Sequence, residues 1–166
     1  EGTTREALSW MRRNRDEPFF VFINLMEPHP PLDYRPAFSD LFIPESLTPE
    51  DLKAVNQNPY SIWAGKESME PEEFLAYQAL YDGELRFMDE HLGAFFDTLK
   101  SEGLLEDTLL IITADHGEQM GEGGYLGHHF ALRDALIHVP LILRAPGIVP
   151  VGVRVPSRVQ TIDILP

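Results

Sequence analysis

The stretch "LLIITADHGE", residues 109–118, decides the fold class, because it joins an apolar run directly to a polar loop. The run Thr108–Thr113 is rich in leucine and isoleucine without polar alternation, which is typical of a strand buried on both faces. Asp115 and His116 follow this run almost at once. Since ligands of open α/β sheets bind beyond the carboxyl ends of the strands, the stretch predicts a strand whose following loop forms one wall of a site.

Three further apolar segments have the pattern of strands. "FFVFINLM" (residues 19–26) and "VPLILRAPG" (residues 139–147) are continuous runs like the first, and a fourth strand is expected around residues 151–155. His29 lies just after the first of these segments. Strands that alternate with long, helix-containing connections predict an α/β fold with a mostly parallel sheet flanked by helices.

Helical patterns lie between these strands. Apolar residues recur at steps of three and four from Phe74 to Leu99, which predicts a long amphipathic helix that ends near Gly103. A capping-box pattern predicts a helix over residues 3–15, and Thr48-Pro49 predicts the start of a short one. Residues 32–70 are otherwise rich in proline, so we expect a surface excursion with little regular structure.

Composition sets the outer limits on function. With 166 residues, of which 43% are hydrophobic, the chain can bury a core. It carries 13 basic and 27 acidic residues, and this net charge of -14 excludes nucleic acid as a partner. The absence of cysteine excludes disulfides, thiolate metal sites and a cysteine nucleophile within the chain. No apolar run is long enough to predict a transmembrane segment.

Asp115 and His116 are the candidate metal ligands. A carboxylate oxygen beside an imidazole nitrogen suits Zn²⁺, Mn²⁺ or a similar divalent ion, and Gly117 permits a turn that points both inward. The alternative is structural: Asp115 would cap a helix, Glu118 would complete a capping box, and His116 would simply be exposed. The residues alone leave both interpretations open.

Histidines supply the other candidate site residues. His29 is held between prolines, which suits a side chain that must meet a substrate, although such histidines also occur in plain turns. His128 and His129 lie in a glycine-containing loop, where each either reaches a ligand or is merely solvated. We assign no chemistry to His91, on the long helix, or to His138, before the third strand.

Five segments together resemble a known family. They occur in the order and at about the spacing found in sulfatases of the alkaline phosphatase superfamily, and they are "FFVFINLMEPHPPL", "YDGELRFMDEHLG", "LLIITADHGE", "GHHFALRDALIHVPLILRAPG" and "VQTIDILP". The resemblance covers nearly the whole chain. It implies an alkaline phosphatase-like fold that is incomplete in this chain, with residues 1–166 as the downstream portion of a single sulfatase-type catalytic domain.

The resemblance also implies roles for individual residues. Asp115 and His116 match the two downstream metal ligands of the family, and His29 matches the histidine that contacts the transferred sulfate and assists the leaving group. His128 falls where related members have a histidine in a Gly-His loop, and we expect it to be catalytic too. Many sulfatases have a lysine in this loop, whereas this chain has none after Lys100.

The implied activity is metal-dependent hydrolysis of a sulfate ester, either a small molecule or a glycan. One divalent cation is expected, with Ca²⁺ favoured by the resemblance and Mn²⁺ or Zn²⁺ by the imidazole donor. A formylglycine nucleophile is expected upstream of this chain, so the isolated chain is expected to be inactive. The alternatives are a phosphodiester or phosphonate monoester hydrolase or a phosphoglycerol transferase of the same superfamily, and a non-catalytic binding module with the same fold. The resemblance is compatible with an exported or periplasmic protein and does not set the compartment or the oligomeric state.

Overall fold

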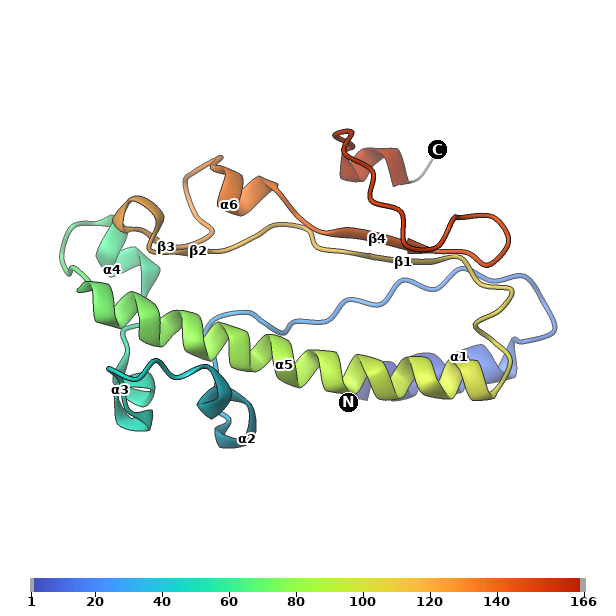
Figure 1. The fold of residues 1–166 in the computed structure, drawn as a ribbon, viewed down its shortest axis with the longest axis horizontal. Helices are drawn as coiled ribbons and strands as arrows, with labels where there is room; N and C mark the ends of the chain where they lie inside the picture. The colour runs from blue at the N-terminus through green and yellow to red at the C-terminus, as the bar shows by residue number, and fades with distance from the viewer. Residues whose placement is uncertain (1, 165–166) are drawn as a thin grey trace.

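A computed structural model describes residues 2–164, and the helix α5 (Pro71–Ser101) runs along its length (Figure 1). Pro71 occupies the first turn, and Glu70 and Glu73 form a reciprocal capping box in front of it. Beyond the last turn, Gly103 adopts a φ of 70°, a left-handed conformation that glycine accepts without strain. The prediction of a long amphipathic helix is confirmed.

The other elements are short and pack around α5. In chain order they are α1 (Gly2–Arg13), α2 (Pro36–Ser39), η1 (Asp40–Phe42), α3 (Pro49–Ala54), α4 (Pro59–Trp63), β1 (Leu110–Thr113), β2 (Gln119–Met120), η2 (Glu122–Gly124), β3 (Leu126–Gly127), α6 (Asp134–Ile137), β4 (Leu141–Arg144) and η3 (Thr161–Ile164). Figure 1 shows α2 and α3 on one side of α5 and the strands on the other, with α1 beside the C-terminal end of α5. Among the described residues, no helix is long and apolar enough to cross a membrane.

Two buried clusters hold these elements together. The larger lies at the N-terminal half of α5, where Tyr77 and Leu80 pack with Leu52, Ile62 and Leu126. The smaller joins α1 to the C-terminal half of α5, and its buried members are Met11, Phe95, Leu99, Leu104 and Leu105. Because apolar burial is the main stabilising contribution, each half of α5 is fixed by its own cluster.

The proline-rich segment 32–70 is more regular than its composition predicts. Three α-helical turns form in it, and each begins at a proline, which suits the first turn of a helix because the missing N–H would have no partner there. The helix predicted after Thr48 is confirmed, with a capping box between Thr48 and Asp51. Leu52 and Ile62 are buried against α5, so this excursion contributes to the core.

The strands confirm the α/β class but not the predicted parallel pairing. β1 and β4 fall inside predicted strands, and they pair antiparallel, with Thr113 opposite Leu141. The connection between them therefore leaves and returns at the same end of the pair, so it needs no crossover. A second antiparallel pair, β2 with β3, forms within this connection.

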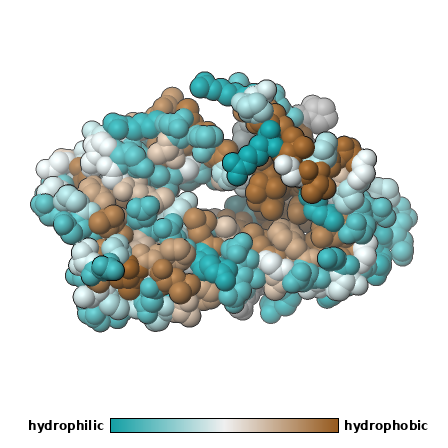
Figure 2. All heavy atoms as spheres, viewed as in Figure 1, coloured by the Kyte–Doolittle hydropathy of each residue, from teal (hydrophilic) through white to brown (hydrophobic). Residues whose placement is uncertain are grey.

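Two predicted strands are absent among the described residues. Residues 19–26 are extended, but no described strand pairs with them, and only alternate side chains pack against the smaller cluster. Phe20 and Phe22 are 73% and 80% exposed, so the segment is not buried on both faces. Residues 151–155 form an exposed turn and irregular chain. Apolar residues also gather on the surface over β1 and β4 (Figure 2), where Ile142 and Leu143 are exposed.

Candidate active site

The chain that follows β1 is held against α6 by a close backbone contact. The amide of Gly117 donates to the carbonyl of Leu136 at 2.8 Å. A Cβ atom at position 117 would lie only 2.0 Å from the carbonyl oxygen of Ala135. Only glycine permits this approach, which anchors the backbone directly after Asp115 and His116.

Asp115 and His116 present two metal-type donors at the end of β1. Nδ1 of His116 donates to the carbonyl of Gly117 at 2.9 Å, so Nε2 retains its lone pair. Nε2 lies 3.8 Å from Oδ2 of Asp115, a separation that an ion bonded to each atom at about 2.0–2.6 Å can bridge. No helix begins at Asp115, and Glu118 bonds elsewhere, so the capping-box alternative is wrong.

Two further histidine rings, those of His128 and His29, lie near this pair. The ring of His128 lies 4.2 Å from that of His116 and 5.5 Å from that of His29, centroid to centroid. The structure thus brings together His29, His116 and His128 from two distant segments, although residues 19–26, which precede His29, do not form the strand on which that expectation was based. Asp115 extends from the same rim, with its side chain 90% exposed.

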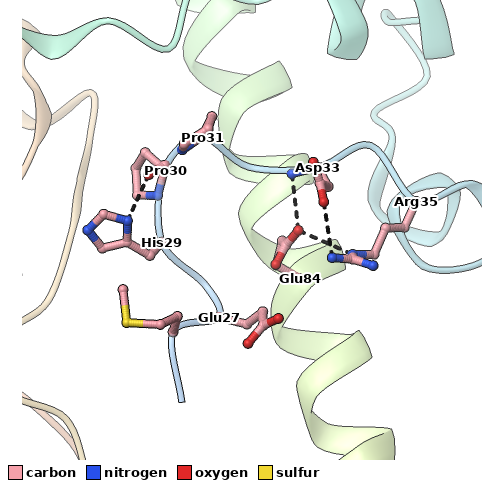
Figure 3. Close-up of a pocket in the computed structure, with 8 residues that line it drawn as sticks. Glu27, His29, Pro30, Pro31, Asp33, Arg35 and Glu84 are labelled. Atoms are coloured by element: carbon pink, nitrogen blue, oxygen red, sulfur yellow. Dashed lines mark hydrogen bonds and ion pairs between the residues drawn. The ribbon is translucent and has the colours of Figure 1, made fainter. Parts of the chain in front are cut away.

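His29 also lines a pocket of about 270 Å³ (Figure 3). Its Nδ1 donates to the carbonyl of Pro30 at 2.7 Å, which leaves Nε2 unengaged by that bond. The other polar side chains that line the pocket are Glu27, Asp33, Arg35 and Glu84. Because three of these groups are carboxylates and one is a guanidinium, the pocket lining next to His29 carries a net negative charge.

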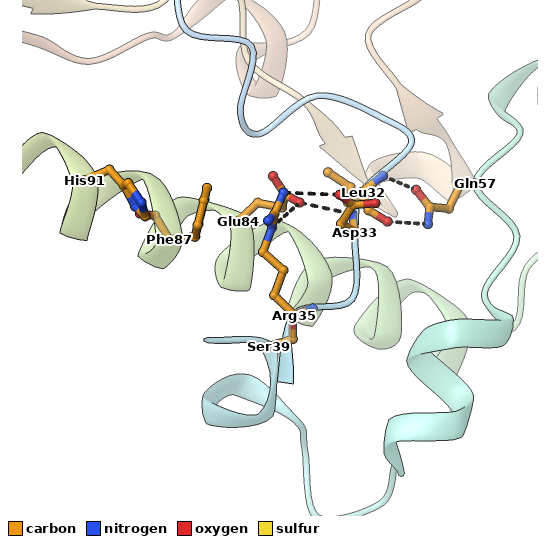
Figure 4. Close-up of polar contacts among 8 residues, drawn as sticks. All are labelled: Leu32, Asp33, Arg35, Ser39, Gln57, Glu84, Phe87 and His91. Atoms are coloured by element: carbon orange, nitrogen blue, oxygen red, sulfur yellow. Dashed lines mark hydrogen bonds and ion pairs between the residues drawn. The ribbon is translucent and has the colours of Figure 1, made fainter. Parts of the chain in front are cut away.

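The pocket wall is tied to α5 through Glu84. This carboxylate is 4% exposed and accepts from the amide of Asp33 at 3.0 Å and from Nε of Arg35 at 3.3 Å (Figure 4). The guanidinium of Arg35 lies over the ring of Phe87 at 4.1 Å. This arrangement was not predicted from the sequence. Glu84 lies seven residues after Tyr77, so it falls on the apolar face of the helix, and a charged residue in that position could have indicated it.

Glu118 is a second functional candidate that sequence analysis missed. Its buried Oε2 accepts from Nδ1 of His128 at 2.8 Å. His116, Glu118 and His128 each offer a donor atom within 4.8 Å of the others, so they form a second group that can hold a metal ion. The β2–β3 pair brings Glu118 and His128 together, and their spacing alone does not reveal this.

The remaining histidines have other partners. Nε2 of His129 lies 3.0 Å from the hydroxyl of Tyr60, and its ring stacks on His128 at 4.7 Å. Nδ1 of His91 donates to the carbonyl of Phe87 within α5, and His138 lies 3.7 Å from Asp134 on α6. These contacts give neither His91 nor His138 a place in the site.

The motif order and this arrangement agree with the comparisons with known proteins. The family described as Sulfatase matches the chain over residues 1–166. The chain belongs to the sulfatase family, in the alkaline phosphatase superfamily. Choline-sulfatase of Rhizobium meliloti is 30% identical over 84% of the chain and 29% of its own length. The uncharacterized sulfatase YidJ of Escherichia coli is 30% identical over 91% of the chain and 31% of its own length.

A solved structure supports the fold of this sulfatase chain. The phosphonate monoester hydrolase SpPMH of Silicibacter pomeroyi matches with a TM-score of 0.66 and 31% identity, over 87% of this chain and 32% of that one. The alkaline phosphatase-like fold expected from the motifs is therefore confirmed. The chain spans about a third of the length of the relatives that it matches.

Proposed function

We propose that the complete protein containing this chain is a metal-dependent hydrolase of sulfate esters, and that residues 1–166 are the downstream portion of its catalytic domain. The observation that carries the proposal is the convergence of His29, His116 and His128 beside Asp115 in a member of the sulfatase family. A small-molecule or glycan sulfate ester is the proposed substrate.

Asp115 and His116 would hold one divalent cation. Their facing atoms, Oδ2 and Nε2, fit an ion by separation and by chemistry. A bound cation would offset the negative charge of the ester and hold one of its oxygens. We propose Ca²⁺ on the family resemblance, with Mn²⁺ or Zn²⁺ favoured by the imidazole donor.

His29 and His128 would act on the ester directly. Each has Nδ1 engaged with an acceptor, the carbonyl of Pro30 in one case and the carboxylate of Glu118 in the other. Nε2 is therefore the nitrogen that each can turn to a substrate. We propose that His29, as the imidazolium, binds an oxygen of the transferred group through Nε2–H and gives that proton to the departing alkoxide, while the imidazolium of His128 holds a second oxygen through its own Nε2–H. The nucleophile, a formylglycine, and further acidic ligands are proposed to lie upstream.

A phosphonate monoester hydrolase is the second candidate. The match to SpPMH, at 31% identity and a TM-score of 0.66, favours it. Both reactions transfer a tetrahedral, anionic group, so the same histidines and cation can serve either one. The identity of the preferred ester separates the two candidates.

The test compares esters on the complete protein. Purified enzyme would be assayed with an aryl sulfate, an aryl phosphonate monoester and an aryl phosphodiester, alongside His29→Ala and His128→Ala variants. His138→Ala is the matched control, because this histidine is exposed and pairs only weakly with Asp134. Faster sulfate turnover that both site variants lower by about 100-fold or more supports the proposal. Faster phosphonate turnover favours the second candidate, and no turnover by folded, metal-loaded protein indicates a binding module.

A further inference from the structure

Glu118 is a buried carboxylate that the proposed reaction does not use. Its side chain is 4% exposed, and it lies directly before β2, between the site and α5. A buried charge of this kind needs partners, because burial without them is costly. Its two oxygens contact different groups, His128 on one side and Tyr77 on the other.

The contact with His128 fixes which ring nitrogen carries the proton. Oε2 of Glu118 lies 2.8 Å from Nδ1, the length of a charge-assisted hydrogen bond. An ionised carboxylate only accepts, so Nδ1 must donate. Nε2, which is separated from Nδ1 by Cε1, is then left as the nitrogen available to a ligand.

Tyr77 supports the carboxylate from α5. Its side chain is fully buried in the larger cluster, and its hydroxyl donates to Oε1 of Glu118 at 3.5 Å. Burial raises the pKa of Tyr77, so the hydroxyl stays protonated and remains a donor. The carboxylate is thus held between a donor in the core and the imidazole at the site.

We propose that Glu118 and Tyr77 are positioning residues that hold the imidazole of His128 with a proton on Nδ1, so that Nε2 is the ring nitrogen that faces the ester. The catalytic consequence rests on the function proposed above, whereas the position of the proton does not. This assignment also makes Glu118 a support of the site rather than a metal ligand. Each oxygen of the carboxylate already has a hydrogen-bond partner, His128 on one side and Tyr77 on the other.

The most informative variant is Glu118→Gln, which keeps the shape of the side chain. Its amide can donate to Nδ1 while its carbonyl accepts from Tyr77, and this arrangement permits the other tautomer, with the proton on Nε2. Glu122→Gln is the matched control. Glu122 lies in the same loop, and its carboxylate accepts from the amide of Met120 at 2.7 Å.

The primary measurement is the tautomer of His128 in the complete protein. Long-range ¹H–¹⁵N correlation spectra of histidine-labelled protein would be recorded near pH 8, with the His128 signals assigned by their loss in His128→Gln. We expect a proton on Nδ1 in the wild type and in Glu122→Gln, and a substantial population with the proton on Nε2 in Glu118→Gln. An Nδ1 proton that is retained in Glu118→Gln would overturn the proposal.

Kinetics and metal content give the second readout. We expect Glu118→Gln to lower kcat by about 10- to 100-fold, with KM changed by less than about 3-fold and with full metal content. Tyr77→Phe should lower kcat by a smaller factor. A Glu118→Gln protein that loses its metal would show that Glu118 is a ligand and the proposal wrong. If the wild type hydrolyses none of the esters, the proposed function fails, and the spectra still decide the tautomer.

Discussion

Arg35 donates its Nε–H to Glu84 at 3.3 Å, and this bond ties the turn that carries His29 to the middle of α5. Glu84 also accepts from the amide of Asp33, so one buried side chain holds two points of the turn. The position of His29 therefore depends on a residue in the core.

Replacement of Glu84 by alanine should loosen this turn. The amide of Asp33 and the guanidinium of Arg35 would each lose a partner, at a cost of about 1–3 kcal/mol of stability. We expect a lower urea midpoint and a lower kcat in the complete protein. The control is Glu90→Ala, an exposed glutamate on the same helix. Equal effects of the two substitutions would contradict the role assigned to Glu84.

Gly117 should not tolerate a side chain. A Cβ there would meet the carbonyl of Ala135, so Gly117→Ala must displace the loop, at about 1–3 kcal/mol. We expect the Gly117→Ala protein to lose its metal ion and to be at least 10-fold less active than the wild type. Gly93→Ala is the matched control, because no atom lies within 4 Å of that position and the residue is in α5. Alanine there should raise stability by up to about 1 kcal/mol. Normal activity of Gly117→Ala would contradict the close approach of Gly117 to the carbonyl of Ala135.

Metal content should depend on Asp115 and His116. Each alanine variant of the complete protein should bind the divalent cation at least 10-fold more weakly, because one of two facing donors is lost. Elemental analysis after dialysis, with circular dichroism to verify folding, measures this. His138→Ala should keep its metal. Full occupancy in folded Asp115→Ala and His116→Ala proteins would exclude both as ligands.

The ion pair between α1 and the end of α5 should make stability depend on pH. Nε of Arg12 donates to Glu102 at 3.0 Å, and these hydrogen bonds lower the pKa of Glu102 below its ordinary value of 4.5. Because the folded-state pKa is the lower one, the pair stabilises the fold above pH 4.5 and loses its effect as the pH falls through the folded-state pKa. The urea midpoints of wild type and Glu102→Gln should differ at pH 7, and this difference should shrink as the pH falls below 4.5. A difference that stays constant over that range would argue against the pair, and Glu45→Gln, at an exposed site, serves as control.

The 166-residue chain on its own should self-associate and lack turnover. Phe20 and Phe22 expose large apolar surfaces on an extended segment that no described strand pairs with. Light scattering coupled to size exclusion should detect oligomers whose size grows with concentration. Serine at both positions should reduce the association. Metal-dependent hydrolysis of an aryl sulfate by this chain, lost in Asp115→Ala, would place the nucleophile inside these residues.

Local patterns predicted the elements that depend on local interactions. The helix α5 follows from its apolar period, and α3 follows from Thr48-Pro49 at its start. The strand expected over residues 19–26 does not form, because a strand needs a hydrogen-bonding neighbour that periodicity does not reveal. Antiparallel pairing of β1 with β4 was missed for a similar reason: the path of the connecting loop depends on the contact of Gly117 with α6.

The candidate site was predicted in part. The residue types and the strand-end rule indicated Asp115, His116 and His29, and the family resemblance added His128. The structure brings these side chains to one rim, while their roles stay predictions. The supporting carboxylates were not found, because their partners are distant in the sequence. Glu84 contacts a turn 49 positions away, and that pairing depends on how the excursion packs.

Tyr77 and Glu84 lie on one face of α5, a single heptad apart, and they support His128 and His29 respectively. The helix α5 therefore sets the distance between the residues that support the two histidines. A residue inserted between positions 77 and 84 would turn one support by about 100° relative to the other. The seven-residue interval from Tyr77 to Glu84 therefore fixes how the supports of the two histidines are oriented relative to each other.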